Sequence, residues 1–240
     1  MVVTVHQPEH LPWQGFMNKV DQADLLVLLD NVQYRERYFQ NRNRILGQNG
    51  PTWLRVPVFS KGHRQKKICE IEIDNTQNWP HKYLETIRYS YKDHPYYPVY
   101  APFFQDLRAR WWTRLAELNE HIIRYFFAVL GVKTPIVRAS ELSGHGSSSE
   151  LLLDLCRKTK ATAYLAGQSA QNYLQEEIFQ AQDIKVLRHR FAHPTYPQFR
   201  RAEFVSHLSV LDLLFNCGPM SLEIIRSGSP HFFISTLGRH

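Results

Sequence analysis

The sequence predicts a three-layer α/β fold built on a mostly parallel, Rossmann-like sheet. The first observation is a strand–helix–strand order near the N-terminus. Met1 to Val5 and Leu25 to Leu29 are short apolar runs, and a helical pattern from Trp13 to Ala23 connects them. The second observation is that the latter half of the chain also alternates strand and helix patterns. Such alternation indicates parallel pairing with right-handed crossovers.

An antiparallel β piece is expected as an insertion at about residues 45–75. Asn31 to Ile45 is rich in arginine and aromatic residues and leads into a strand. Gln48-Asn49-Gly50 is a hairpin turn signal. Pro57 indicates an edge position in the return strand. The remaining segments are the return strand, a basic loop and a further strand, at residues 53–58, 60–67 and 68–73.

Helical periodicity dominates from about residue 79 to residue 131. The first helix covers residues 79–90, and Asp93-His94-Pro95 ends it. The longest helical stretch covers residues 103–131 and carries a single apolar stripe. Gly131 is a suitable C-cap for this long helix.

The rest of the chain completes one α/β domain over residues 1–220. Residues 221–240 are expected to form a loosely structured tail. The predicted strands cover residues 136–139, 162–166 and 184–188. The predicted helices cover residues 151–160, 173–181 and 204–215.

Composition narrows the class of protein. The chain has 240 residues, of which 43% are hydrophobic and 21% charged, as in ordinary globular proteins. It has no apolar run of membrane-spanning length and no signal-peptide pattern, and three widely spaced cysteines argue against a disulfide framework. We therefore expect a cytoplasmic protein without a membrane span. The net charge of +7 favours anionic partners such as nucleotides, sugar nucleotides or RNA. The oligomeric state is left open.

The turn after the first strand is the strongest candidate site. His6, Gln7, His10 and Trp13 crowd this turn. Open α/β sheets bind ligands at the carboxyl ends of their strands, and helix N-termini attract anions. The alternative interpretation is a structural turn that its two prolines hold in place.

Two more segments are expected at the same edge of the sheet. Asp30 to Tyr34 follows the second strand, and Ala166 to Asn172 follows a later one. We therefore expect His6, Gln7, Asp30 and Gly167 to line one cleft.

The predicted binding residues extend beyond the turn. Arg42 and Arg44, with neighbouring arginines, present guanidinium groups that bind phosphate or carboxylate. Tyr34 and its aromatic neighbours are able to stack on a base or sugar. An ordinary solvated basic loop is equally consistent with this pattern.

A strand-to-helix turn and a late histidine complete the predicted site. Gly167 and Gln168, followed by Tyr173, suit a phosphate or a sugar hydroxyl, although plain helix capping gives a similar pattern. His193 is a further binding candidate. No carboxylate or cysteine is spaced with His189 and His193 as metal ligands usually are, so we predict no metal site.

Several of these motifs together resemble the WbqC-like family. The resemblance spans roughly residues 2–218 and implies a role in decorating an amino sugar in glycoconjugate biosynthesis. The motifs that carry it are His6-Gln7-Pro8, Leu11-Pro12-Trp13, Gly15-Phe16, Lys19, Leu29-Asp30-Asn31-Val32-Gln33-Tyr34, Asn41-Arg42-Asn43-Arg44-Ile45, Tyr164-Leu165-Ala166-Gly167, Tyr173, His193-Pro194 to Gln198, Leu208-Ser209-Val210-Leu211-Asp212, Asn216 and Gly218.

The order of elements is also similar to nucleotidyltransferases and ligases with an HxGH turn, such as pantothenate synthetase. Histidines in that turn stabilise a triphosphate during nucleotidyl transfer. Here the second histidine of the turn is replaced by Trp13. The resemblance therefore implies that His6 substitutes for it or that the chemistry differs.

These observations lead to one functional expectation and one alternative. The expected enzyme is a transferase or an ATP-dependent amide ligase. It would transfer an acyl or aminoacyl group to the amine of a sugar or sugar nucleotide, from an acyl adenylate or an aminoacyl-tRNA. ATP is a candidate cofactor and tRNA a candidate partner. His6 would act as general base or face the phosphate of the donor, while Gln7 and Asp30 would orient the amine. The alternative is a non-catalytic module that binds a nucleotide sugar or RNA.

Overall fold

The computed structural model describes residues 1–59, 62 and 65–229. Its centre is a five-stranded sheet in the order β5-β2-β1-β6-β7. Every neighbouring pair in this sheet runs parallel, which confirms the predicted α/β class. The strands are β1 (Val2–His6), β2 (Leu25–Leu28), β5 (Ile136–Arg138), β6 (Ala163–Ala166) and β7 (Lys185–Arg188).

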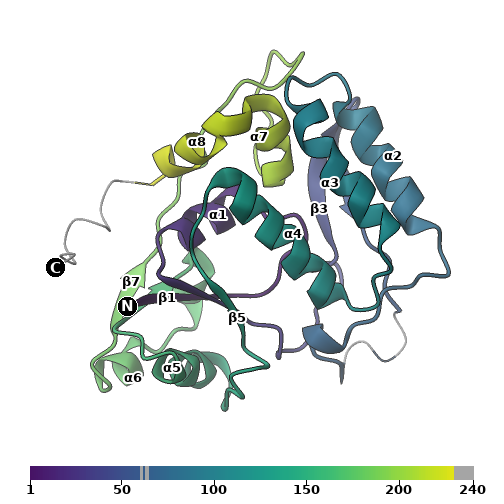
Figure 1. Cartoon of the computed structure of the whole chain (residues 1–240). Helices are drawn as coiled ribbons and strands as arrows, with labels where there is room; N and C mark the ends of the chain where they lie inside the picture. The colour runs from purple at the N-terminus through teal and green to yellow at the C-terminus, as the bar shows by residue number, and fades with distance from the viewer. Residues whose placement is uncertain (60–61, 63–64, 230–240) are drawn as a thin grey trace.

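Helices cover both faces of this sheet (Figure 1). Val3, Val5 and Val27 belong to a buried cluster with residues of α5 and α6. Leu26 and Leu28 of β2 pack instead with residues of α1 and α4. This division follows from the alternation of side chains along a strand. The helices are α1 (Gln14–Asp21), α4 (Leu115–Leu130), α5 (Ser148–Lys158) and α6 (Glu176–Gln180).

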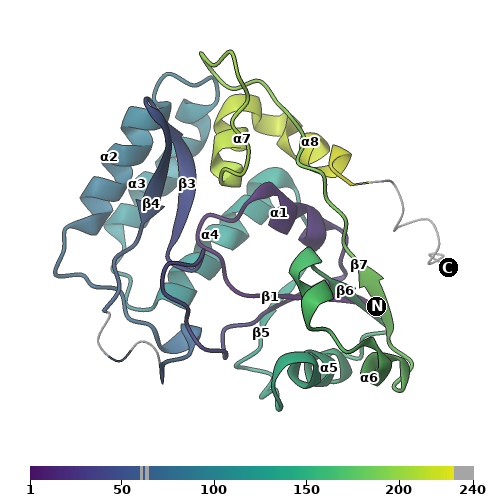
Figure 2. The same cartoon turned by 180° about the vertical axis from the view of Figure 1, so that it is seen from behind.

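The predicted antiparallel insertion forms a two-stranded hairpin. Strands β3 (Arg42–Gly47) and β4 (Gly50–Arg55) pair around the predicted turn. Figure 2 shows this hairpin from behind, beside α2. The strand predicted at residues 68–73 does not form. The 3-10 helix η2 (Ile68–Glu70) takes its place, and Glu72 and Ile73 make only isolated bridges. Part of the predicted basic loop at residues 60–67 lies outside the described residues.

The predicted continuous helix over residues 103–131 is wrong. Helix α2 (Trp79–Tyr91) is followed by α3 (Tyr97–Ala109), and α4 begins only at Leu115. The intervening segment pairs with residues that follow η2. Ile73 donates a backbone hydrogen bond of 2.9 Å to Thr113, and Leu115 donates one of 3.0 Å to Ile71. This tertiary pairing overrides the helical pattern.

Two helices in the last third of the chain also differ from prediction. The 3-10 helix η3 (Gln168–Asn172) precedes α6, so the helix predicted at residues 173–181 is shorter. Helix α7 (Val210–Cys217) begins later than predicted and leads into η4 (Gly218–Met220).

The predicted loose tail begins with a helix. Residues 221–227 form α8 (Ser221–Ser227), which contacts α1. Ile225 is fully buried, and Arg226 forms an ion pair with Asp21 on α1. The predicted boundary at residue 220 is therefore corrected, while residues 230–240 lie outside the described part. No helix among the described residues is both long and apolar enough to cross a bilayer.

Candidate functional site

The turn after β1 is held in a strained conformation at the carboxyl edge of the sheet. Leu11 has a backbone φ of 46° and is fully buried. The left-handed region costs a residue with a side chain about 1–2 kcal/mol. The side-chain amide of Asn43 on β3 donates a hydrogen bond of 2.7 Å to the Leu11 carbonyl. Hairpin and turn therefore support each other.

Four ionisable side chains gather beside this turn, and we call them the ionisable cluster: His6, Glu9, Lys19 and His189. The His6 Nε2 atom lies 3.7 Å from Oε1 of Glu9. Lys19 interacts electrostatically with each of the other three. Its Nζ atom donates a hydrogen bond of 3.2 Å to the backbone carbonyl of Val5. The cluster thus joins β1, α1 and the segment after β7.

Burial favours the uncharged forms of the ionisable side chains in the cluster. Burial raises the pKa of Glu9 to about 8, and the nearby Lys19 opposes that rise. Burial lowers the pKa of Lys19 to about 7, and Glu9 opposes that fall. Burial, followed by the positive charge of Lys19, holds the pKa of His6 well below its usual value. Burial therefore favours the neutral forms of the His6 imidazole and the Glu9 carboxyl, which are a proton acceptor and a proton donor.

Hydrogen bonds define how both histidines of the cluster are protonated. Nδ1 of His6 lies 3.1 Å from the carbonyl oxygen of Gln7, so Nδ1 carries the proton and Nε2 is an acceptor. Nε2 of His189 donates to Oδ1 of Asn18 at 2.8 Å. The amide nitrogen of Asn18 donates to the Ile225 carbonyl, which fixes Oδ1 as the acceptor.

His10 has a structural position. Its side chain is fully buried, and its Nδ1 and Nε2 atoms lie 2.9 Å from Oδ1 of Asn119 and the hydroxyl of Tyr83. The amide nitrogen of Asn119 donates to the carbonyls of Pro8 and Gln40. Both ring nitrogens are therefore occupied, and in this conformation the predicted substrate-binding residue His10 is closed off from a substrate.

Gln7 connects the turn to the arginine-rich loop. The side-chain amide of Gln40 donates a hydrogen bond of 2.7 Å to Oε1 of Gln7. Oε1 of Gln40 in turn accepts from the backbone of Arg35. This loop therefore has a fixed position relative to His6.

Asp30 follows β2 and faces β5, which pairs with β2 on the side away from β1. Its two carboxylate oxygens accept from the backbone nitrogen and the hydroxyl of Ser140, at 2.9 and 2.7 Å. Ser140 follows β5, so these bonds tie the ends of β2 and β5 together. The contacts of the predicted catalytic residue Asp30 are those of a residue that positions the sheet edge.

Three predicted binding residues meet at Phe191, which sequence reasoning missed. Its ring lies 5.6 Å from that of Trp13 and 6.1 Å from that of His193. Its carbonyl accepts a hydrogen bond of 3.3 Å from Gln168. Gly15 allows the indole of Trp13 to lie close to α1, because a Cβ at Gly15 would be 2.3 Å from the ring.

Gly167 lies beside Lys19 of the cluster. A Cβ at Gly167 would be 3.6 Å from Nζ of Lys19. Tyr173 is farther along the same loop, half-buried, and interacts electrostatically with Tyr38 and Arg35. The turns after β1 and β6 therefore share this edge with the arginine-rich loop.

The remaining predicted residues lie on or near the hairpin. The guanidinium of Arg42 lies 4.2 Å from the centre of the Trp53 ring. Arg44 donates a hydrogen bond to the His207 carbonyl. Tyr34 is buried, which raises its pKa to about 12.

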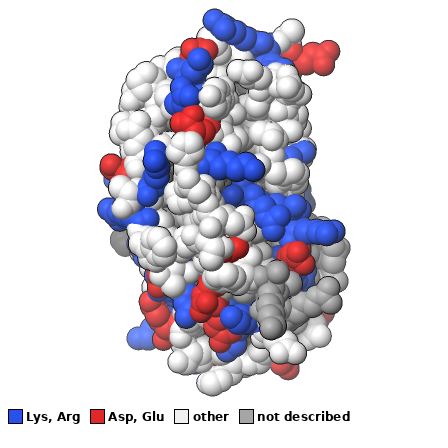
Figure 3. Space-filling model, turned by 90° about the vertical axis from the view of Figure 1, so that its right-hand side faces the viewer, with Lys and Arg blue, Asp and Glu red and all other residues white. Residues whose placement is uncertain are grey.

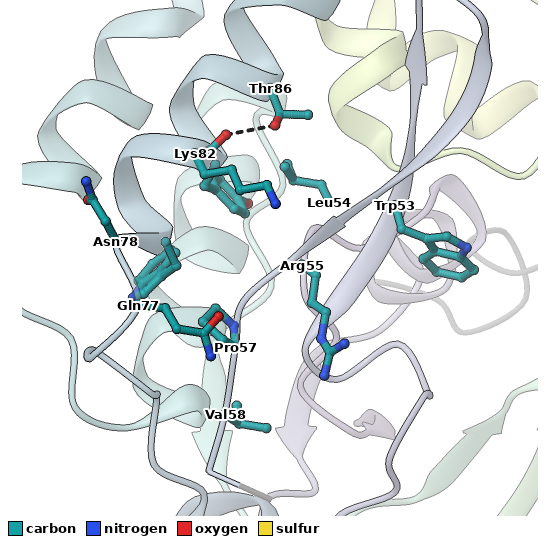
Figure 4. A pocket seen from close by; sticks show the side chains of 11 residues that line it. Trp53, Leu54, Arg55, Pro57, Val58, Gln77, Asn78, Lys82 and Thr86 are labelled. Atoms are coloured by element: carbon teal, nitrogen blue, oxygen red, sulfur yellow. Dashed lines mark hydrogen bonds between the residues drawn. The ribbon is translucent and has the colours of Figure 1, made fainter.

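A cavity of about 420 Å³ lies between β4 and α2 rather than at the ionisable cluster. Arg55, Gln77 and Lys82 are among its lining residues (Figure 4). Within the described ranges, no group of three His, Cys, Asp or Glu side chains is placed to hold a metal ion.

Glu9, Lys19 and His189 were not among the predicted site residues. The available signal was Lys19 itself, a lysine on a short helix between two buried strands. Every residue of α1 from Gln14 to Val20 is buried in the structure. A charged side chain enclosed in this way is usually functional or paired.

The fold and the cluster define an α/β protein with a group of buried ionisable side chains at the carboxyl edge of its parallel sheet. The chain belongs to the WbqC-like protein family, whose model matches residues 7–224. It is 29% identical over 227 residues to uncharacterized protein Rv1507c of Mycobacterium tuberculosis. That match covers 93% of this chain and 97% of the mycobacterial protein. No solved structure matches the chain.

Proposed function

We propose that this protein is an enzyme that forms an amide on the amino group of a sugar or sugar nucleotide. The observation that carries the proposal is the placement of His6 and Glu9 beside Lys19, with Nε2 of His6 3.7 Å from Oε1 of Glu9. Amide formation needs a base for the amine and an acid for the leaving group. A role in glycoconjugate biosynthesis is consistent with the family.

The reaction assigns one task to each member of the cluster. The lone pair of the amine attacks the acyl carbon, a C–N bond forms, and the acyl C–O bond of the donor breaks. The donor oxygen leaves with that electron pair, either as AMP or as a ribose hydroxyl. Nε2 of His6 takes the proton that the amine loses, and Glu9 protonates the leaving oxygen where it needs a proton. Lys19 stabilises the negative charge that develops on the acyl oxygen.

The predicted binding residues fit around this reaction. Gly167 and Gln168 would hold phosphate or sugar hydroxyls, and Gln7 would orient the amine. Arg42 and Arg44 would contact the anionic part of the donor or the sugar nucleotide. Asp30 would act indirectly, because Ser140 occupies its carboxylate.

The test is product formation with two donor systems. UDP-linked amino sugars are incubated with ATP and a panel of carboxylic acids, or with mixed aminoacyl-tRNA, and mass spectrometry detects the new amide. Pyrophosphate exchange into ATP identifies an adenylating enzyme. We expect an amide with one donor system and at least 100-fold less with His6→Gln. Tight binding of the sugar nucleotide without turnover in either system would instead indicate a non-catalytic binding module.

A further inference from the structure

The outer face of the β3–β4 hairpin carries arginines and a tryptophan. In the register of the hairpin, Arg44 on β3 lies opposite Trp53 on β4, and Arg42 lies opposite Arg55. Directly paired residues and alternate residues of a strand share one face of a sheet. The other face carries buried residues such as Leu54. The hairpin therefore turns a basic and aromatic face outward.

Exposed aromatic rings extend this face toward the ionisable cluster. The Phe39 ring lies 6.1 Å from Trp53 and 5.5 Å from Tyr38, and all three rings are partly exposed. The backbone carbonyl of Phe39 accepts a hydrogen bond of 2.8 Å from the backbone nitrogen of His10 in the turn after β1. Tyr173 interacts with Tyr38 from the other side. The row of rings therefore joins the hairpin to the site.

The arginines of this face are not paired with carboxylates, in contrast to six others. Within the described part of the chain, Arg42, Arg44 and Arg55 form no ion pair with a carboxylate. Elsewhere among the described residues, six arginines pair with Asp or Glu: Arg88, Arg114, Arg124, Arg138, Arg188 and Arg226. The hairpin therefore presents positive charge that described carboxylates do not neutralise.

A cavity continues the surface past the edge of β4. The side chain of Lys82 extends from α2 toward β4, and Arg55 and Gln77 also line the space (Figure 4). Its volume of about 420 Å³ is within the usual range for small-ligand sites. Lys and Arg side chains also cross the middle of the face that carries α2 (Figure 3).

We propose that the surface formed by Tyr38, Phe39, Arg42, Trp53 and Arg55 binds the end of a single-stranded RNA. Aromatic rings stack on bases without sequence preference, while arginines contact the phosphates. A six-residue strand such as β3 is about 20 Å long, which exceeds one nucleotide. The inference deepens the proposed function, because an acyl group esterified to such an RNA end would reach the cluster along the row of rings.

The experiment measures binding without turnover. The probe is a fluorescein-labelled ten-nucleotide single-stranded RNA of mixed sequence, titrated with the full chain and followed by anisotropy at several salt concentrations. We expect Trp53→Ala to weaken binding at least tenfold. Arg55→Gln should weaken RNA binding and reduce the slope of log affinity against log salt concentration by about one, which corresponds to one lost phosphate contact.

Tyr89→Ala is the matched control. Arg88 covers the Tyr89 ring at 4.7 Å, much as Arg42 covers Trp53, but Arg88 is paired with Glu85. Tyr89 is 57% exposed and Trp53 is 46% exposed. We expect Tyr89→Ala to bind RNA like the original protein, and circular dichroism verifies the fold of each variant.

Three results would overturn the inference. The first is RNA binding that Trp53→Ala leaves unchanged. The second is AMP competing as strongly as the oligonucleotide, which indicates a mononucleotide site. The third is that Trp53→Ala weakens the binding of a heparin fragment as much as it weakens the binding of RNA. That result would indicate that the natural ligand is an acidic polysaccharide. RNA binding without amide formation would contradict only the proposed function.

Discussion

Lys19 on α1 donates a hydrogen bond of 3.2 Å from Nζ to the backbone carbonyl of Val5 on β1. Both residues are buried, so the lysine is anchored at the carboxyl end of the central strand with little access to water. An ammonium group in such a place affects the titration of every neighbour, because a buried pair of charges is weakly screened.

Lys19→Met should therefore change the titration of two histidines. Burial is the main cause of the low pKa of His6 and of His189, and the positive charge of Lys19 lowers both pKa values further, so both should rise part of the way toward 6.5 in the variant. Nuclear magnetic resonance titration of the histidine ring protons from pH 4 to pH 8 measures this change. Unaltered titration of both rings would show that Lys19 does not act on them.

His6→Gln should lower kcat by about 10²–10⁴-fold, because a positioned acid–base group contributes that much. KM should change little, since Gln keeps a polar side chain in the turn. Steady-state kinetics measure both constants once the substrates are known. His145→Gln, which replaces an exposed histidine elsewhere, should leave both constants unchanged. Normal turnover in His6→Gln would reduce His6 to a turn residue.

Gly15→Ala should destabilise the fold by about 1–3 kcal/mol through overpacking against the Trp13 ring. Glycine-to-alanine changes within helices usually stabilise by up to about 1 kcal/mol, so the expected sign is reversed. Urea unfolding measures the difference. Gly167→Ala is the control, because its Cβ would make only an ordinary contact of 3.6 Å and its φ of −69° suits alanine. Equal stability of Gly15→Ala and the original protein would disprove the close packing.

His10 should make the protein sensitive to acid. Burial lowers the pKa of His10 to about 4, against a usual value of 6.5. A histidine held neutral in the fold stabilises fully above pH 6.5, and this stability is lost as the pH falls through 4. His10→Gln should remove a slope of about 1.4 kcal/mol per pH unit in that window.

Urea unfolding of both proteins at pH 7.5, 6 and 5 measures this slope. The other buried groups are common to the two proteins, so their contributions cancel in the difference. Glu9 is one such group, and its raised pKa acts with the opposite sign, since its stability is present below 4.5 and lost as the pH rises through about 8. Parallel pH profiles would show that His10 is protonated in the fold or exposed.

The sequence predicts the sheet well because its strands are short apolar runs between clear turns. The turns at His6 and Gly167 follow directly from that topology. The helix predicted over residues 103–131 failed because the backbone of Thr113 and Leu115 hydrogen-bonds to residues about forty positions earlier. Local periodicity does not reveal such a long-range contact. Glu9 and Lys19 were missed for a related reason, since burial of a charged residue is decided by distant elements that close over it.

The central position of β1 determines when the parallel sheet can be completed during synthesis. β1 pairs with β2 on one side and with β6 on the other. At ordinary elongation rates, on the order of ten seconds separate the emergence of β2 from that of β6. Throughout this interval one edge of the apolar run Val2 to Val5 lacks its neighbouring strand and invites pairing with other nascent chains.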